Sequence, residues 1–292
     1  MRSSLKKGLG IILAGVVAAG CLAGCGAASN GGNSVGTASS SADNIAASNG
    51  KDLLDKILAD GTITIGVNPP GEPICFYDDN GNLIGYDIDW ANKLGEVLGV
   101  DVKFVEVNSE NRISAVTSGR VDVIFANITG NLERAKSIDF SLPYLKTGIK
   151  LATRKGLDDV QTVEDLNDPK YTVAVGSGTT GEQLVLQDAP NCNISYIASF
   201  ADQCLALQEG KADAILEDGT SIDYAASKGD YMDVKDKLYT SDPICIGYAK
   251  GNPELGRYLD MFVSSMISSG YQADEYSKWF GTEFKGTLNT LW

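Results

Sequence analysis

The 292-residue sequence contains no histidine. Without imidazole, the chain cannot build a Ser-His-Asp or Cys-His catalytic arrangement or a histidine-based metal site. Four of its six cysteines, Cys75, Cys192, Cys204 and Cys245, lie beyond the N-terminal region and show no C-x-x-C spacing. Zinc and thioredoxin-like redox chemistry therefore have no support. We predict no metal and no cofactor, and we expect buried thiols rather than disulfides.

Basic residues are in deficit, with 24 Lys and Arg against 38 Asp and Glu, which gives a formal net charge of −14. Three of the basic residues lie within the first 24 positions, so the remainder carries about −17. A charge of this sign excludes nucleic acid as a partner and excludes electrostatic adhesion to anionic lipid.

The N-terminus has the pattern of a processed signal. A basic start at residues 2–7 precedes 13 residues of apolar character, Gly8 to Gly20, too short to span a bilayer but suited to secretion. Leu22-Ala23-Gly24-Cys25 then resembles the bacterial lipobox, which predicts a signal peptide over residues 1–24 and a lipid anchor on Cys25. The alternative is an ordinary signal peptide with incidental cysteines, and Cys21 is a poorer second candidate for the anchor.

Residues 25–50 are expected to be a flexible tether. After Cys25 they are almost entirely Gly, Ala, Ser, Asn and Thr, a composition that cannot form a core. The random-coil reach of such a segment is on the order of 25–30 Å. We therefore expect the functional domain to begin at residue 51, on the extracytoplasmic face of the cell membrane.

Beyond the tether, strand and helix patterns alternate in two successive runs. The first run predicts strands at 62–67, 102–107 and 121–126 and helices at 51–59, 87–98 and 113–117. The second predicts strands at 172–175, 194–197 and 213–217 and helices at 181–187 and 200–208. Extended crossovers are expected at 144–154 and 239–248, before a helix at 253–269. This order predicts an α/β fold with two lobes, residues 51–145 plus 244–292 and residues 146–243, around a cleft between strand ends.

The segment from Val121 to Tyr144 has the composition of a carboxylate site. A buried strand leads into small and polar residues and then to Arg134. Guanidinium is permanently charged and holds a carboxylate with two parallel hydrogen bonds, and ligands of open α/β sheets bind outside the strand ends. The alternative is that Arg134 pairs with a surface acid, Glu133 or Asp139.

Several short motifs, in order, resemble the extracytoplasmic solute-binding proteins of amino-acid ABC importers, family 3. They are Gly85-Tyr86-Asp87-Ile88-Asp89, Asn111-Arg112-Ile113, Gly119-Arg120-Val121-Asp122, Thr129 with Arg134, Asp139-Phe140-Ser141, Pro143-Tyr144, Ser177-Gly178-Thr179-Thr180 and Ala212 to Asp218. The resemblance covers residues 51 to about 283. It implies a two-lobed, type II periplasmic-binding-protein-like fold with two crossover hinge segments.

The resemblance also implies roles for single residues. Arg134 would clamp the ligand α-carboxylate, helped by Thr129, and the Asn127 carbonyl would accept from the α-ammonium. From the other lobe, Thr179 and Thr180 would offer amides at a helix N-terminus, which favours an anion. Asp218 would accept from the ammonium. The alternative for Asp218 is a helix N-cap before Gly219-Thr220.

The side-chain pocket rests on fewer residues. In family members that take acidic or polar amino acids, an arginine at the position of Arg112 reaches the ligand's distal group, and Asn68 lies where the family often places a specificity residue. The alternative for Arg112 is a solvated arginine at a helix start. Gly71 replaces an aromatic common in the family, and Glu72 beside it would repel an acidic substrate, so the pattern departs from a simple glutamate or aspartate site.

The predicted function is the substrate-binding component of an amino-acid ABC importer. It would capture a polar L-amino acid, of acid or amide type, and deliver it to a membrane permease, as a monomer that meets the membrane only through its lipid and has no catalytic residue. One alternative is an enzyme, because cyclohexadienyl and arogenate dehydratases resemble this family. Such chemistry needs a general acid. Only Glu72 and Glu217 offer one, and strand alternation predicts that Glu217 faces away from Asp218. Another alternative is an amino-acid-sensing module with the same ligand residues.

Overall fold

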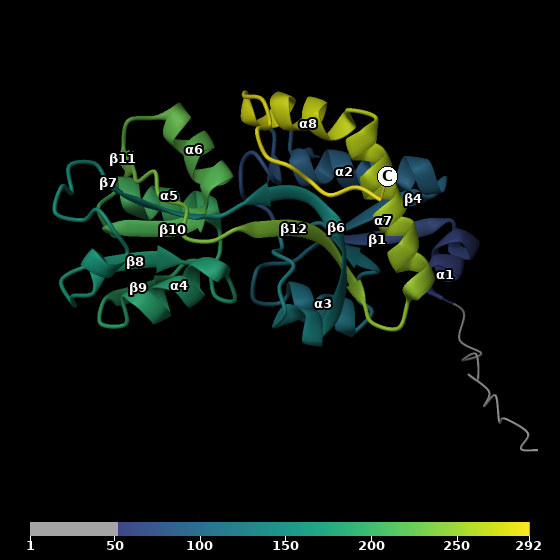
Figure 1. Cartoon of the computed structure of the whole chain (residues 1–292), viewed down its shortest axis with the longest axis horizontal. Coiled ribbons are helices and arrows are strands. Elements are labelled where there is room, and N and C mark those ends of the chain that lie inside the picture. Colours follow the sequence, from purple (N-terminus) through teal and green to yellow (C-terminus); the bar gives the residue numbers. More distant parts are fainter. Residues whose placement is uncertain (1–51, 292) are drawn as a thin grey trace, which may run out of the picture. The chain divides into compact units, whose positions relative to one another are not determined.

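The computed structural model describes residues 52–291, all within one compact unit that spans residues 48–292. The signal peptide, the anchor at Cys25 and the tether predicted above lie outside the described residues. Two five-stranded sheets, each covered by its own helices, make up this unit (Figure 1). Within residues 52–291, no helix is both long enough and apolar enough to cross a membrane.

The first half of the fold is built on the sheet with strand order β4-β1-β5-β12-β6. Its strands are β1 Thr62–Val67, β4 Asp101–Glu106, β5 Val123–Ile124, β6 Ile138–Thr147 and β12 Asp242–Ala249. Its helices are α1 Leu53–Asp60, α2 Tyr86–Leu98, α3 Arg112–Thr117, α7 Pro253–Ser268 and α8 Tyr271–Phe280. A short hairpin, β2 Phe76–Tyr77 and β3 Leu83–Ile84, precedes α2. Strand alternation gives β1 two buried faces, one against α2 and α7 and one toward α3.

The second half of the fold is built on the sheet with strand order β11-β7-β10-β8-β9. Its strands are β7 Ile149–Arg154, β8 Thr172–Val175, β9 Asn193–Tyr196, β10 Ala214–Asp218 and β11 Met232–Val234. Its helices are α4 Thr180–Asp188, α5 Phe200–Gln208 and α6 Gly219–Lys228. One apolar cluster under α4 and another under α5 and α6 bury the two faces of this sheet. Because β8, β9 and β10 are parallel, their carboxyl ends meet at one edge.

Two antiparallel strands, β6 and β12, carry the chain between the halves (Figure 1). Their register pairs Thr147 with Asp242 at one end and Ile138 with Ala249 at the other. Gly148 alone separates β6 from β7, so the chain passes directly from one sheet to the other. The predicted extended segment at 144–154 is therefore confirmed as the end of β6 followed by β7.

Most predicted elements appear within a residue or two of their expected bounds, and β1, β8 and α5 match them fully. The strand expected at 121–126 is two residues long in the structure. Asp122, just before it, still meets β1: its backbone amide donates to the Thr64 carbonyl oxygen at 2.8 Å, and its carboxylate accepts from the Thr64 amide at 2.8 Å. The three-residue edge strand β11 was missed. Four free thiols occur in the described residues, with Cys75 and Cys245 buried and Cys192 and Cys204 partly buried.

Candidate functional site

One cavity lies between the carboxyl-end loops of the two sheets, and residues of both halves line it. Its lining includes all eight side chains predicted to bind a ligand: Asn68, Arg112, Asn127, Thr129, Arg134, Thr179, Thr180 and Asp218. These residues span 151 positions of sequence, so the fold, rather than local spacing, brings them together. In residues 52–291, no group of three or more His, Cys, Asp or Glu side chains is placed to hold a metal ion.

Arg134 begins a short 3₁₀ turn, Arg134–Lys136, after β5 and is buried. Its guanidinium donates to the Thr129 carbonyl oxygen at 2.8 Å and, across the cavity, to the Gly178 carbonyl oxygen at 2.9 Å. The alternative of a surface pair is wrong, because Glu133 bonds Lys136 and Asp139 bonds Lys250. Burial lowers the pKa of Arg134, and the charge of Asp218 opposes that shift. Guanidinium has five N–H donors, so donors remain for a carboxylate.

Asp218 ends β10 and occupies the N-cap position of α6, yet its carboxylate makes no capping bond. Instead Oδ2 accepts from Asn127 Nδ2 at 2.7 Å, a contact between the two halves. The helix-capping alternative is therefore wrong for this side chain. Oδ1 is buried and has no hydrogen-bond partner. Burial, with the neighbouring charges of Glu217 and Asp242, raises the pKa of Asp218 well above its usual value.

Asn127 lies at the centre of the first half of the site with a left-handed backbone, φ 46°. The backbone amide of Asn127 donates to Asp87 Oδ2 at 2.9 Å, and the other carboxylate oxygen of Asp87 accepts from the Tyr144 hydroxyl at 2.6 Å. Burial raises the pKa of Asp87 to about 6, although the hydrogen bonds from Tyr144 and Asn127 act to lower it. Asp87 thus fixes the backbone that presents Asn127 to Asp218, a role that its motif alone did not reveal.

Arg112 is 4% exposed at the start of α3, so the alternative of a solvated arginine is wrong. Its Nη1 donates to the carbonyl oxygens of Ala126 at 2.7 Å and Asn127 at 3.1 Å, while Nε is buried without a partner. The Asn127 carbonyl, predicted to accept from a ligand ammonium, therefore already accepts from this guanidinium. Burial and the charge of Arg134 lower the pKa of Arg112 to about 9, so it stays charged at neutral pH.

The N-terminus of α4 faces the same cavity. Thr179 is the N-cap, and its hydroxyl accepts from the Glu182 amide at 3.0 Å and donates to the Gly176 carbonyl. Thr180 is the first residue of the helix, where backbone N–H groups have no partner within the helix. This end of α4 therefore offers donors to an anion held by Arg134.

The lining also includes residues that were not predicted as ligand contacts, among them two with large polar side chains, Glu217 and Gln203. Glu217 was expected to face away from Asp218, but both line the cavity, and Glu217 Oε1 accepts from the Asp218 amide at 3.2 Å. The prediction was wrong because β10 ends at Asp218 beside the cavity, so residues from both faces of the strand border it there. The second, Gln203, comes from the middle of α5 and is 1% exposed.

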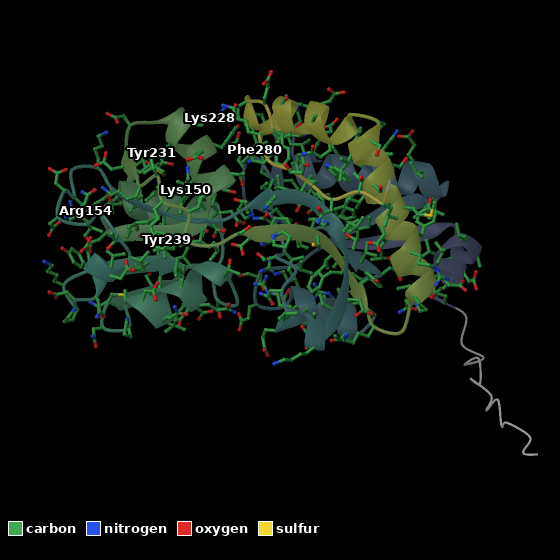
Figure 2. The ribbon with its side chains drawn as sticks, in the orientation of Figure 1. Lys150, Arg154, Lys228, Tyr231, Tyr239 and Phe280 are labelled. Carbon is green, nitrogen blue, oxygen red and sulfur yellow. The ribbon has the colours of Figure 1, made fainter. Side chains whose placement is uncertain are left out.

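The two halves also meet beside the cavity. The Tyr224 hydroxyl of α6 donates to Glu72 of the β1–β2 loop at 2.6 Å. Next to this bond, Lys228 of α6 and Phe280 of α8 line a surface groove (Figure 2). Gly178, at φ 76°, lies so close to the first half that a Cβ there would stand 3.0 Å from the Ser109 carbonyl oxygen. These contacts, with those of Arg134 and Asn127, hold the halves together over the cavity.

Comparison with known proteins assigns the family. Residues 63–282 match the model of the bacterial extracellular solute-binding proteins, family 3. The chain belongs to this family. Among its relatives, the L-cystine-binding protein TcyJ of Escherichia coli (strain K12) is 28% identical over 233 residues, which cover 79% of this chain and 87% of TcyJ. The ABC transporter glutamine-binding protein GlnH of Bacillus subtilis (strain 168) is 29% identical over 278 residues, 94% of this chain and 97% of GlnH.

Solved structures agree with the fold of this solute-binding protein. The ancestral amino acid-binding protein AncCDT-1, described as a precursor of cyclohexadienyl dehydratase, superimposes with a TM-score of 0.74 at 34% identity. The match covers 78% of this chain and 99% of AncCDT-1. The predicted family and the predicted α/β fold are confirmed.

Proposed function

We propose that this protein is the substrate-binding component of an amino-acid ABC importer, which captures a polar L-amino acid between its two halves and delivers it to a permease. One observation carries the proposal. A buried cation, Arg134, and a buried anion, Asp218, enter one cavity from opposite halves of the fold, each with hydrogen-bonding capacity to spare. An α-amino acid has the complementary pair of charges on adjacent groups.

In the proposed complex, the α-carboxylate lies between Arg134 and the N-terminus of α4, and the α-ammonium donates to Asp218 Oδ1. Each charge-assisted hydrogen bond contributes roughly 1.5–3 kcal/mol net. Because the two anchors belong to different halves, an open form satisfies only one of them. The ligand therefore shifts the population toward the closed form.

Closure of the two halves over a ligand requires a hinge between them. The halves correspond to residues 51–145 plus 244–292 and to residues 146–243, and they would move about the ends of β6 and β12. The names of the cystine- and glutamine-binding relatives support an amino acid as the ligand. Delivery to a permease and attachment to the membrane through Cys25 are part of the same proposal.

A thermal-unfolding panel of the twenty amino acids plus L-cystine tests the proposed function. Ligand at 100 times its Kd adds about 2.7 kcal/mol to the apparent free energy of unfolding, so a true ligand raises the melting temperature measurably. We expect at least one polar amino acid to do so. If every amino acid leaves the melting temperature unchanged, the proposal is wrong.

An enzyme on the same scaffold is the second candidate, and one observation favours it. Glu217 lies in the cavity, and burial raises its pKa, as a general acid requires. AncCDT-1 is described as a precursor of cyclohexadienyl dehydratase, which gives the reaction to assay. Incubation with prephenate or arogenate would release a detectable aromatic product if this candidate were correct.

A further inference from the structure

The cavity contains more polar groups than the two anchors of an amino acid require. In residues 52–291, five buried side-chain atoms lack a hydrogen-bond partner: Trp90 Nε1, Arg112 Nε, Gln203 Oε1, Asp218 Oδ1 and Gln272 Nε2. Three of them belong to residues that line this cavity, Arg112, Gln203 and Asp218. Buried polar groups in native proteins are normally hydrogen-bonded, so these atoms indicate where a polar ligand binds.

Under the proposed function, Asp218 binds the α-ammonium and Arg134 binds the α-carboxylate. Among the other lining residues, Arg112 and Glu217 are the charged ones, and Arg112 and Gln203 have the unpartnered buried atoms, so these three are assigned to the ligand side chain. Arg112 can only donate hydrogen bonds, and an ionised Glu217 can only accept them. Besides the two anchors, the cavity lining therefore carries one basic and one acidic side chain rather than two of the same kind.

The amide of Gln203 acts as an acceptor in this cavity. Its Nε2 donates to the Ile197 carbonyl oxygen at 2.9 Å, and a carbonyl can only accept, so the nitrogen is fixed on that side. The amide oxygen is the atom left without a partner. Gln203 thus joins Glu217 in offering acceptors to the cavity, while Arg112 offers donors.

The three kinds of polar ligand side chain differ in how well they pair with Arg112, Glu217 and Gln203. A carboxylate would accept from Arg112 but would face Glu217 and the Gln203 oxygen without a proton to donate. A guanidinium or ammonium would satisfy these acceptors but would bring a third cation beside Arg112 and Arg134. A carboxamide has an oxygen for Arg112 and an NH₂ group for Glu217 and Gln203, and it adds no net charge.

We propose that the ligand side chain ends in a carboxamide, with Arg112 donating to its oxygen and with Glu217 and Gln203 accepting from its nitrogen. This inference rests on the proposed function and narrows its substrate class from polar amino acids to glutamine or asparagine. It also assigns Glu217 and Gln203 as the residues that discriminate the amide from the acid.

Calorimetric titration of the purified protein with matched ligands tests the assignment. The panel consists of L-glutamine, L-asparagine, L-glutamate, L-aspartate, L-arginine, L-lysine and L-cystine. A site that hydrogen-bonds a particular head group discriminates strongly against the analogue that leaves its groups unpaired, so we expect one amide to bind at least about tenfold more tightly than its acid. The Glu217→Gln variant should reduce that ratio about tenfold, because glutamine at this position can donate to a carboxylate.

Two further variants complete the test. Gln203→Met removes the acceptor while keeping a side chain of similar length, so the amide should bind about tenfold more weakly. Glu209→Gln, a surface change that removes the same charge, should leave every affinity as in the wild type. Thermal unfolding of each variant without ligand shows whether it is folded.

The outcomes separate this inference from the proposed function. If an acid, a basic amino acid or cystine binds more tightly than both amides, the carboxamide assignment is wrong while the amino-acid-binding function stands. If the amides bind best and neither Glu217→Gln nor Gln203→Met alters the preference, the assigned residues are wrong. If no amino acid binds, the proposed function fails and this inference with it.

Discussion

The two halves of the site differ in the sign of what they bring to the cavity. The first half supplies two buried guanidinium groups, Arg112 and Arg134, each already bonded to backbone carbonyl oxygens of its own half. The second half supplies two carboxylates, Glu217 and Asp218, and the unpartnered oxygen of Gln203. Neither half alone carries both charges, so under the proposed function the binding of a zwitterion would depend on closure.

The largest expected effect comes from removing one charge of the first half. Arg134→Ala leaves the α-carboxylate and Asp218 without their cation, and truncating one member of a buried charge pair commonly costs about 100-fold or more in affinity. We expect no thermal shift with any amino acid. Arg154→Ala is the control, since Arg154 pairs with Asp213 away from the cavity. Full-strength binding by Arg134→Ala would place the ligand elsewhere.

The close packing of the two halves at Gly178 can be disturbed by a substitution that changes no charge. A Cβ at Gly178 would stand 3.0 Å from the Ser109 carbonyl oxygen, so Gly178→Ala should oppose closure and weaken binding by about tenfold. Gly156→Ala is a matched control, because Gly156 has the same φ of 76° with no atom within 4 Å of the added Cβ. Both variants carry the same backbone strain. Equal affinities for the two variants would show that Gly178 does not meet the first half on closure.

Acidification should weaken binding through the second half. Burial and the charges of Glu217 and Asp242 raise the pKa of Asp218 before ligand binds, so it holds a proton at higher pH than an exposed aspartate. An ammonium ligand binds the deprotonated form, so binding releases that proton. Below the raised pKa, the affinity should fall by up to about tenfold for each pH unit.

Calorimetry in two buffers of different ionisation enthalpy, repeated as the pH is lowered from neutral, counts the protons exchanged on binding. Asp87, whose pKa burial raises to about 6, also titrates on acidification but faces Asn127 and Tyr144 rather than the ligand. Net proton release on binding supports the assignment of Asp218. Net proton uptake would contradict it.

The smallest expected effect concerns the hydrogen bond between Tyr224 and Glu72 at the rim of the cavity. Tyr224→Phe removes the hydrogen bond from α6 to Glu72, a partly exposed contact between the halves, and should weaken ligand binding only about two- to threefold. Tyr77→Phe is the control, because the Tyr77 hydroxyl bonds Glu106 within the first half. Equilibrium titration of both variants with the same ligand measures the difference. Identical effects would mean that the rim bond does not favour the closed form.

The site residues of the two halves also differ in how well the sequence alone predicted them. Arg134 and the small polar residues before it follow one buried strand, so a local pattern predicted a carboxylate site there. The resemblance to the family then added the roles of Asn127 and Thr129. Asp218 was identified through the resemblance to the family, since its position before a helix fits an ordinary N-cap equally well. The fold itself followed from the alternation of strand and helix patterns, which local periodicity reports directly.

Glu217 and Gln203 could not be predicted from local sequence for different reasons. Alternation places Glu217 and Asp218 on opposite faces of β10, but the strand ends beside the cavity, so both residues line it. Gln203 lies inside α5 and carries no local signal that separates it from a surface glutamine. Its unpartnered oxygen becomes visible only when the neighbours of α5 are known.

Binding of two ligand analogues tests the central claim most directly. One analogue of the tightest-binding amino acid replaces the α-ammonium with hydrogen, and the other replaces the α-carboxylate with hydrogen. Each analogue engages the charge of only one half, so calorimetry should show a loss of about 100-fold or more for both, relative to the parent amino acid. If either analogue binds as tightly as the parent, the ligand is not held as a zwitterion between the two halves.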